Sequence, residues 1–134
     1  MSLMKILSVS SSAVMAESQR LNVVASNLAN ADSVAGPDGQ AYKARQVVFQ
    51  TQTGVPAGQT GVRVSNIVED QAPAKRNYDP THPMADAEGY VTQSNVNVVE
   101  EMVNMMSASR SYQNNIEVMN TAQQLMIKTL QLGQ

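Results

Sequence analysis

The residues best suited to acid–base or metal chemistry lie between positions 79 and 88. His82 is the single histidine of the chain, and Asp79, Asp86 and Glu88 are close to it in the sequence. A lone histidine without a second histidine or a cysteine is usually an exposed loop residue, and this acidic spacing matches no calcium-binding loop. We therefore interpret the stretch as a solvated turn and predict no catalytic residue, cofactor site or metal site.

The other candidates for chemistry are weaker still. The chain contains no cysteine, which excludes disulfides and thiolate chemistry. Its glycines follow no phosphate-binding or dinucleotide-binding spacing, and the serines at positions 10–12 have no paired base. The sequence therefore predicts a protein that is not an enzyme and that takes no small-molecule substrate.

Composition excludes two further classes of partner. The 134 residues have a net charge of -2 and a pI near 5.2, so no basic surface is available for nucleic acid or anionic lipid. No segment reaches the roughly 18 apolar residues that a direct membrane span requires. The length suits one domain and is short for two.

The sequence predicts two long helices, one at each end of the chain, and these must position any binding surface of the protein. We expect the first helix over residues 3–30, closed by Asn27 and Asn30, because asparagine tolerates the left-handed conformation that often ends a helix. The second helix is expected to begin near residues 95–97 and to end at Leu132, before Gly133.

Both predicted helices carry a seam of residues at alternating steps of four and three. This 3.5-residue repeat favours a partner helix over a globular core. The first seam comprises Leu3, Leu7, Ser10, Val14, Glu17, Leu21, Val24 and Leu28, and the second comprises Val98, Met102, Met105, Ser109, Tyr112, Ile116, Met119, Gln123, Met126 and Leu130.

The predicted fold class is mainly α, with the two helices forming an antiparallel coiled-coil hairpin around a small, irregular, β-containing middle segment. With the termini flush, Leu3 would lie opposite Leu130 and Ser10 opposite Gln123. A polar pair inside an apolar seam disfavours slips of register. We expect three parts: the N-terminal helix over 1–30, the middle segment over 31–94 and the C-terminal helix over 95–134.

The middle segment contains most of the glycine and proline. Strands are expected over 42–50 and 62–68, joined by a long loop over 53–61, and a short third strand is expected to begin near Glu88. The segment has few large apolar residues, so we expect it to lean on the helices or on neighbouring subunits.

Sparse charge on the helices points to further packing partners. Charged residues make up 15% of the chain, against about 25% in typical proteins, and residues 1–30 carry only Lys5, Glu17 and Arg20. Outer faces of Ser, Asn, Gln and Ala suit a helix that is covered by neighbours, although an ordinary weakly charged surface helix stays open as an alternative. Five of the nine methionines lie in the second helix, where we interpret them as helix–helix packing residues.

The N-terminus imitates a secretory signal peptide, with Lys5 followed by a short apolar run and a small-residue site at Val14-Met15-Ala16. Serines at positions 8 and 10–12 interrupt the apolar run, and cleavage after Ala16 would remove half of the first seam. We therefore predict that no signal peptide is cleaved.

Two motifs, one in each helix, resemble those of bacterial flagellar rod and hook proteins. The first covers residues 18–32, and the second covers 94–103 and continues over 110–115. The segment 85–91, the chain length and the short middle add to the resemblance, which is closest to a subunit of the proximal rod in the flagellar basal-body rod protein family. The motif residues are Asn22, Asn27, Leu28, Ala29, Asn30, Asn95, Val96, Glu101, Met102, Arg110, Tyr112 and Asn115.

The resemblance implies an axial component of the bacterial flagellum, exported through the flagellar type III export apparatus without a cleaved signal. It implies helical assembly with itself and with other proximal and distal rod subunits into a drive shaft that crosses the periplasm and transmits torque. It also implies that the terminal helices form the inner coiled-coil domain around the export channel, and that they are disordered before assembly.

Two alternatives stay open. Asn27 and Asn30 are either a local helix cap or a pair that also recognises a neighbouring subunit. The alternative function is a soluble helical-hairpin binding module, such as a secretion chaperone that grips a partner helix. A chaperone would be a stable oligomer of defined size in solution, whereas a rod subunit would gain helix on polymerising.

Overall fold

The computed structural model describes residues 2–54 and 58–134, which form two helices and four strands. Helix α1 spans Leu3–Ala29 and helix α2 spans Val98–Leu132. This confirms the mainly α class with a small antiparallel β middle. The strands between the helices are β1 (Arg45–Gly54), β2 (Gln59–Glu69), β3 (Lys75–Tyr78) and β4 (Tyr90–Gln93).

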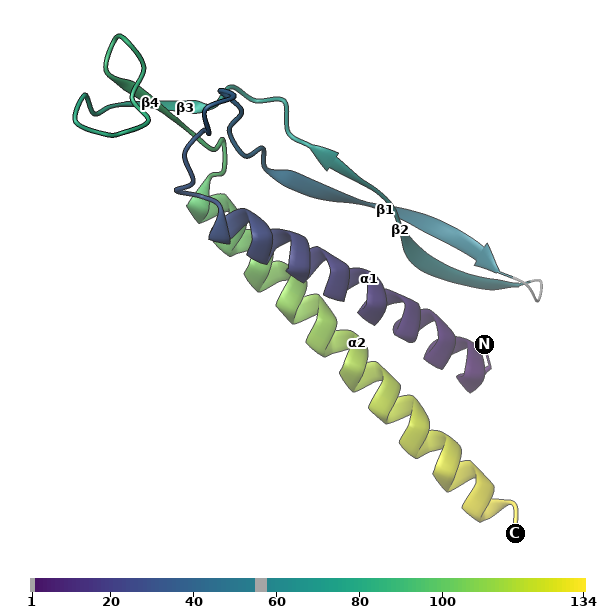
Figure 1. Ribbon diagram of the computed structural model, residues 1–134. Coiled ribbons are helices and arrows are strands. Elements are labelled where there is room, and N and C mark those ends of the chain that lie inside the picture. The colour runs from purple at the N-terminus through teal and green to yellow at the C-terminus, as the bar shows by residue number, and fades with distance from the viewer. Residues whose placement is uncertain (1, 55–57) are drawn as a thin grey trace.

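Helix α1 is the middle layer of the molecule (Figure 1). The β1–β2 hairpin runs along one side of α1, and α2 runs antiparallel to α1 along another side. The small β3–β4 sheet projects beyond the end of the helical pair, and α2 continues past the N-terminal end of α1. Neither helix, in the part of the chain described, is long and apolar enough to cross a membrane.

Local capping fixes the helix bounds close to those expected. The Asn97 side chain accepts a hydrogen bond from the Glu100 backbone N–H at 3.3 Å, and Glu100 and Glu101 stabilise the positive N-terminal end of α2. Helix α1 ends without the left-handed residue that we expected. Asn30 has φ -104°, and its amide instead donates to the Ser26 carbonyl at 2.8 Å, which satisfies a free carbonyl of the last turn.

The β1–β2 hairpin is longer than predicted. Its antiparallel register runs from Arg45↔Glu69 to Gly54↔Gln59, with an irregularity between Val48 and Phe49. The loop predicted over 53–61 was wrong at both ends, because residues 53–54 and 59–61 pair as strand, and residues 55–57 lie outside the described residues. Threonines at the tip suit the pleated backbone although they add nothing to an apolar pattern.

The second sheet was only half predicted. Strand β4 begins at Tyr90, close to the expected start, and pairs with β3 from Tyr78↔Tyr90 to Lys75↔Gln93. Strand β3 is exposed throughout, so it has no buried face to impose an alternating pattern on the sequence.

The core between the layers is built from small side chains. Ala16, Val24, Ala108 and Ala122 are buried along the helices. At the end of the helical pair, Ala31, Ala44 and Val96 form a buried cluster against which Tyr42 packs. Small residues let the helical backbones approach closely, but they bury little apolar area, so this chain has little independent stability.

The flush helical register was wrong. Leu3 and Ile6 border one groove with residues 114–125 of α2, and Leu130 is 66% exposed. Ser10 is buried, but Gln123 is exposed and does not pair with it. A buried Asn27–Glu101 hydrogen bond and the small layers at Ala108 and Ala122 determine the register, and they leave the end of α2 overhanging.

The seam of α2 that faces α1 differs in half its positions from the prediction. The large residues Met105, Tyr112, Met119 and Met126 were predicted and are partly buried. The residues that alternate with them along the seam are small or polar, namely Glu101, Ala108, Asn115 and Ala122. A prediction based on large apolar residues therefore does not include them. The predicted Val98, Met102, Ile116 and Leu130 are exposed instead. On α1, Ser10, Glu17 and Val24 are buried, and Leu3, Leu7, Val14, Leu21 and Leu28 are partly buried.

Candidate assembly site

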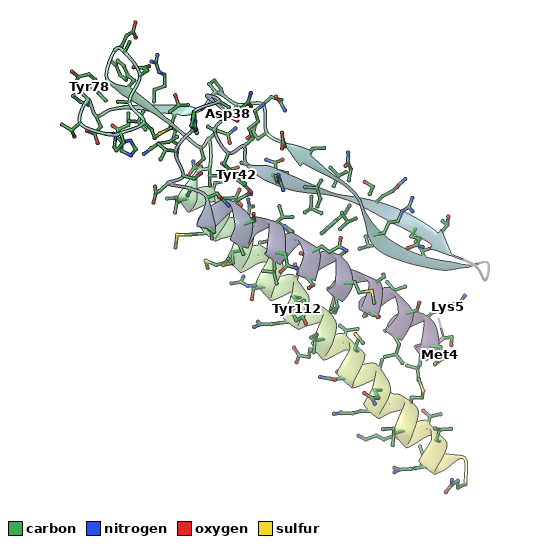
Figure 2. All side chains as sticks on the ribbon, in the orientation of Figure 1. Met4, Lys5, Asp38, Tyr42, Tyr78 and Tyr112 are labelled. Atoms are coloured by element: carbon green, nitrogen blue, oxygen red, sulfur yellow. The ribbon has the colours of Figure 1, made fainter. Side chains whose placement is uncertain are left out.

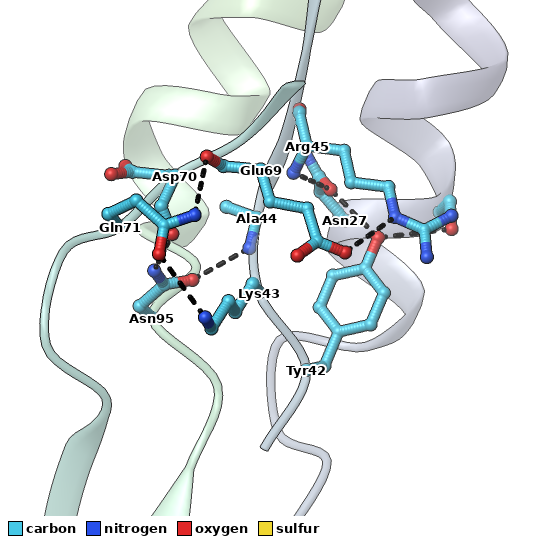
Figure 3. Close-up of polar contacts among 10 residues, drawn as sticks. Asn27, Tyr42, Lys43, Ala44, Arg45, Glu69, Asp70, Gln71 and Asn95 are labelled. Atoms are coloured by element: carbon cyan, nitrogen blue, oxygen red, sulfur yellow. Dashed lines mark hydrogen bonds and ion pairs between the residues drawn. The ribbon is translucent and has the colours of Figure 1, made fainter. Parts of the chain in front are cut away.

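Asn27 lies at a polar junction between α1, β1 and α2 (Figure 3). Its amide nitrogen donates to the Arg45 carbonyl at 2.8 Å and to Glu101 Oε2 at 3.1 Å. Its oxygen accepts from the Arg45 backbone N–H and from the Tyr42 hydroxyl, both at 2.9 Å. The side chain is 0% exposed, and these bonds use every donor and acceptor position of the amide. Asn27 therefore joins three elements without leaving a polar atom unsatisfied.

Asn95 binds the backbone of the residue next to Arg45. Its oxygen accepts from the Ala44 backbone N–H at 2.7 Å, and its nitrogen donates to the Asp70 and Ala72 carbonyls, both at 3.0 Å. The adjacent backbone amides of Ala44 and Arg45 are thus bound by two asparagines, one from the end of α1 and one from the segment that leads into α2. We call the set Asn27, Tyr42, Arg45, Asn95 and Glu101 the amide clamp.

The clamp forms at the first residue of β1 and the loops around it, on backbone groups that bond side chains and not the β1–β2 ladder. Buried backbone groups outside helices and sheets need side-chain partners. Ser94 supplies one by donating to the Ala31 carbonyl at 2.6 Å, and Lys75 supplies another by donating to the Val96 carbonyl at 2.6 Å. The entry to α2 is therefore tied to the exit from α1.

Weaker contacts surround the clamp on its exposed side. Arg45 Nε lies 3.9 Å from Glu69 Oε1, and Lys43 donates to Gln71 at 3.3 Å (Figure 3). Exposed ion pairs of this kind contribute about 0–1 kcal/mol. We therefore assign the positioning of β1 to the buried amides.

Two acidic residues are buried along α1 and α2. Glu17 Oε2 lies 3.5 Å from the Arg20 guanidinium one turn later in the same helix, and Glu101 is bound by Asn27. Glu101 therefore has a hydrogen-bond partner within its own subunit, whereas Glu17 Oε2 is buried beside Arg20 without a hydrogen bond from any residue that the structure describes.

Helix α2 presents large apolar side chains that α1 does not cover. Met102 is 54% exposed and Met106 is 63% exposed. Further exposed apolar residues occupy the same heptad series towards the end of α2, with Ser109, Gln113, Asn120 and Gln123 at the positions between them. An exposed apolar face of this length marks a protein–protein interaction site. We call it the outer stripe, and it consists of Val99, Met102, Met106, Ile116, Ile127 and Leu130.

The outward face of α1 has a different character. Met4 and Met15 are exposed, with Ser8, Ser18 and Asn22 between and beyond them, and none of these side chains is charged. Met4 and Lys5 extend from the first turn of α1 (Figure 2). A face of small neutral residues can be covered without burying an unpaired charge.

The acidic loop between β3 and β4 uses its polar groups internally. The Thr81 hydroxyl donates to Asp79 at 2.7 Å and lowers the pKa of that carboxyl. Hydrogen bonds from the backbone amides of Tyr90 and Glu88 and from the Arg76 side chain lower the pKa of Asp86 and outweigh the opposing effect of desolvation. His82 Nδ1 accepts from the Met84 backbone N–H at 3.0 Å. These groups shape a turn.

The motif residues divide into internal, exposed and partly buried groups. Asn27, Asn95, Val96 and Glu101 are internal, whereas Asn22, Ala29, Met102 and Arg110 are exposed. Asn30 caps α1, and Leu28, Tyr112 and Asn115 are partly buried, with Asn115 donating to the Ser111 carbonyl.

Sequence reasoning missed Tyr42 and Arg45 as members of the clamp. Both had been placed in a predicted strand. Their contacts with Asn27 arise from the chain reversal between residues 30 and 42, and no periodic spacing records such a contact.

Comparisons with known proteins find family matches for both terminal segments of the chain. Residues 7–37 match the family described as "Flagella basal body rod protein", and residues 87–132 match "Flagellar basal body rod FlgEFG protein C-terminal". The chain is 60% identical to the flagellar basal-body rod protein FlgC of Escherichia coli O157:H7 over 100% of both chains. It is 59% identical to FlgC of Salmonella typhimurium strain LT2 and 37% identical to FlgC of Buchnera aphidicola subsp. Baizongia pistaciae, again over 100% of both chains.

Proposed function

Because the chain belongs to the FlgC family of flagellar basal-body rod proteins, we propose that it polymerises helically through the faces of its two helices. It is a structural subunit of the basal-body rod, not an enzyme, and it assembles with other rod components. The observation that carries the proposal is the outer stripe, which lies on α2 and is left uncovered by the described residues of its own subunit. Neighbouring subunits supply that cover.

The helices form the inner part of the rod in this proposal. Residues 1–30 and 95–134 pack as a coiled coil around the export channel, and residues 31–94 lie outside them as lateral contacts. The seam residues of both helices carry the assembly in two ways. Those that face the other helix hold the helical pair together, and the exposed ones, such as Met102 and Ile116, contact neighbouring subunits. This arrangement is supported by the apolar outer stripe and by the uncharged outward face of α1, since both suit burial between many subunits. The resulting shaft transmits torque.

Ordering of the helices accompanies assembly. The small core of alanines and valines buries too little area to offset the ordering of two long helices in a free subunit. Contacts with neighbours add the missing burial. The free chain is therefore partly disordered and gains helix on polymerising.

The subunit reaches the rod, which crosses the periplasm, through the flagellar type III export apparatus without cleavage of a signal peptide. Helix α1 runs without interruption through Ala16, the residue before the mimicked cleavage site, and Ala16 is 3% exposed. Cleavage there would remove the first half of the α1 seam.

Deletion of the gene followed by imaging of basal bodies tests the proposed function. We expect cells without rods, restored by the wild-type gene. Leu21→Asp places a charge in the partly buried α1 seam and should also block rod assembly, whereas His82→Ala, in the β3–β4 loop, should leave swimming intact. Intact rods in the deletion strain would overturn the proposed function, and motile Leu21→Asp cells would remove the seam from it.

A further inference from the structure

Two apolar grooves run along the sides of α2, and each contains a single charged residue. One groove, of about 410 Å³, is lined by Met102, Met105, Met106, Ser109 and Gln113 together with Arg110. The other, of about 450 Å³, contains Glu117 and is lined by Leu3 and Ile6 of α1 with Val118 and Leu125 of α2. The two grooves therefore have the same apolar character and opposite charge.

Helix geometry separates the two grooves around α2. At about 100° per residue, the groove with Arg110 and the groove with Glu117 are centred roughly 110° apart, and α1 occupies the third side. Arg110 and Glu117 themselves are seven residues apart, which is about 10 Å along the helix axis. Their charged groups thus lie on the ridge between the grooves, at different heights.

The charges of Arg110 and Glu117 contrast with those elsewhere in the molecule. Glu17 lies beside Arg20, Arg45 beside Glu69 and Arg76 beside Asp86. In the described part of the chain neither Arg110 nor Glu117 forms an ion pair, and both side chains are exposed. A single charge at the edge of an apolar groove favours a partner surface that brings the opposite charge.

We propose that the Arg110 groove of one copy packs against the Glu117 groove of the next copy, with Arg110 and Glu117 forming an ion pair across the contact. The proposal rests on the proposed function and names the partner surface of that assembly. Because the contact joins two different surfaces, it does not close on itself, and its repetition by a screw operation produces a filament. The ion pair fixes the axial offset between neighbouring copies.

Charge reversal tests the contact in living cells. Arg110→Glu and Glu117→Arg each place like charges opposite one another, so each should reduce the number of completed rods per cell by about tenfold or more. The double variant R110E/E117R restores opposite charges with the polarity exchanged and should recover rod numbers to near the wild-type value. Lys128→Glu reverses an exposed charge on α2 outside both grooves and serves as the matched control.

Site-specific cross-linking provides a second readout that does not depend on the charge change. Since the natural chain has no cysteine, rods from cells that produce both Arg110→Cys and Glu117→Cys chains should yield a disulfide-linked dimer on oxidation. Rods containing either chain alone should not. A dimer formed by Arg110→Cys alone would show a two-fold contact and would overturn the heterologous one.

The interface is also overturned if single reversals leave rods at wild-type numbers, or if the double variant is no better than the single ones. That second outcome would assign the partner surface to a different rod component. Detection of the natural chain in wild-type rods separates this interface from the proposed function. If the natural chain is absent from those rods, the proposed function is wrong. If it is present and the charge-reversal variants still assemble normal numbers of rods, only this interface is wrong.

Discussion

Asn27 and Asn95 show how two uncharged side chains can organise a chain with little apolar core. Together they bind the backbone amides of Ala44 and Arg45 and thereby attach β1 to both helices. A buried amide with all its hydrogen bonds made tolerates few replacements, because loss of either partner leaves a desolvated polar group. The clamp therefore specifies one arrangement of α1, β1 and α2.

Asn27→Asp should destabilise the subunit strongly. The new carboxylate cannot donate to Glu101 or to the Arg45 carbonyl, and it places two buried negative charges about one hydrogen-bond length apart. We expect a loss of about 3–5 kcal/mol in the free energy of unfolding. Because the free chain is only marginally stable, this loss should remove most of its folded population, measured as lost helical circular dichroism of the purified chain.

A second substitution distinguishes this cause from general damage to α1. Adding Glu101→Gln removes one charge and supplies an amide that can donate to the new aspartate, so it should recover about half of the loss. Asn22→Asp, at an exposed position on the same helix, should change stability by no more than about 0.5 kcal/mol. Equal effects of the substitutions at Asn22 and Asn27 would refute the clamp.

The β3–β4 loop should open in acid. Hydrogen bonds to the ionised carboxylates lower the pKa of both Asp79 and Asp86, so the folded loop binds fewer protons than the unfolded one. The resulting stabilisation is fully present above about pH 4 and is lost as the pH falls through the lowered values. The amide chemical shifts of Glu88 and Tyr90 should follow this transition by NMR. In the Asp86→Asn variant these shifts should no longer follow a titration of residue 86. Shifts of the wild-type protein that stay constant down to about pH 2 would contradict the expectation.

At the scale of the elements, helix bounds followed from the sequence because capping is local. Asn97, Glu100 and Glu101 specify the start of α2 within a few residues. The helix face was harder to predict, because α2 carries two overlapping heptad patterns. The more apolar pattern divides between two faces, because its Met102 and Ile116 face outward whereas its Met105 and Tyr112 face α1. The second pattern completes the contact with α1 through Ala108 and Ala122.

Close packing of α1 against α2 at the alanine layers predicts that a larger side chain there is destabilising. Ala108 is fully buried, so Ala108→Leu should overpack the contact between α1 and α2 and destabilise the subunit by about 1–3 kcal/mol. Ser107→Leu introduces the same side chain at the neighbouring exposed position and should have little effect. The helical circular dichroism of the two purified chains, measured against that of the natural chain, compares the two. A harmless Ala108→Leu would show that the seam is not closely packed at this layer.

At the scale of the whole molecule, the subunit is an open structure with α1 in the middle and α2 extending beyond it (Figure 1). The helical content and the antiparallel order of the helices could be predicted from the two end segments. The amide clamp and the helix offset could not, because they depend on polar contacts between residues far apart in the sequence, such as Asn27 and Glu101. The same polar contacts leave the apolar outer stripe available to neighbours.

Solvent accessibility of the outer stripe in the assembled rod tests the central claim most directly. Met102→Cys and Ile116→Cys each place a single thiol on the stripe of a chain that otherwise has none. Both thiols should react readily with a maleimide in the free subunit and at least about tenfold more slowly in intact rods, because neighbouring subunits cover them. Dissociation of the rods should restore the reaction. Equal reaction rates in free subunits and intact rods would contradict assembly through this face.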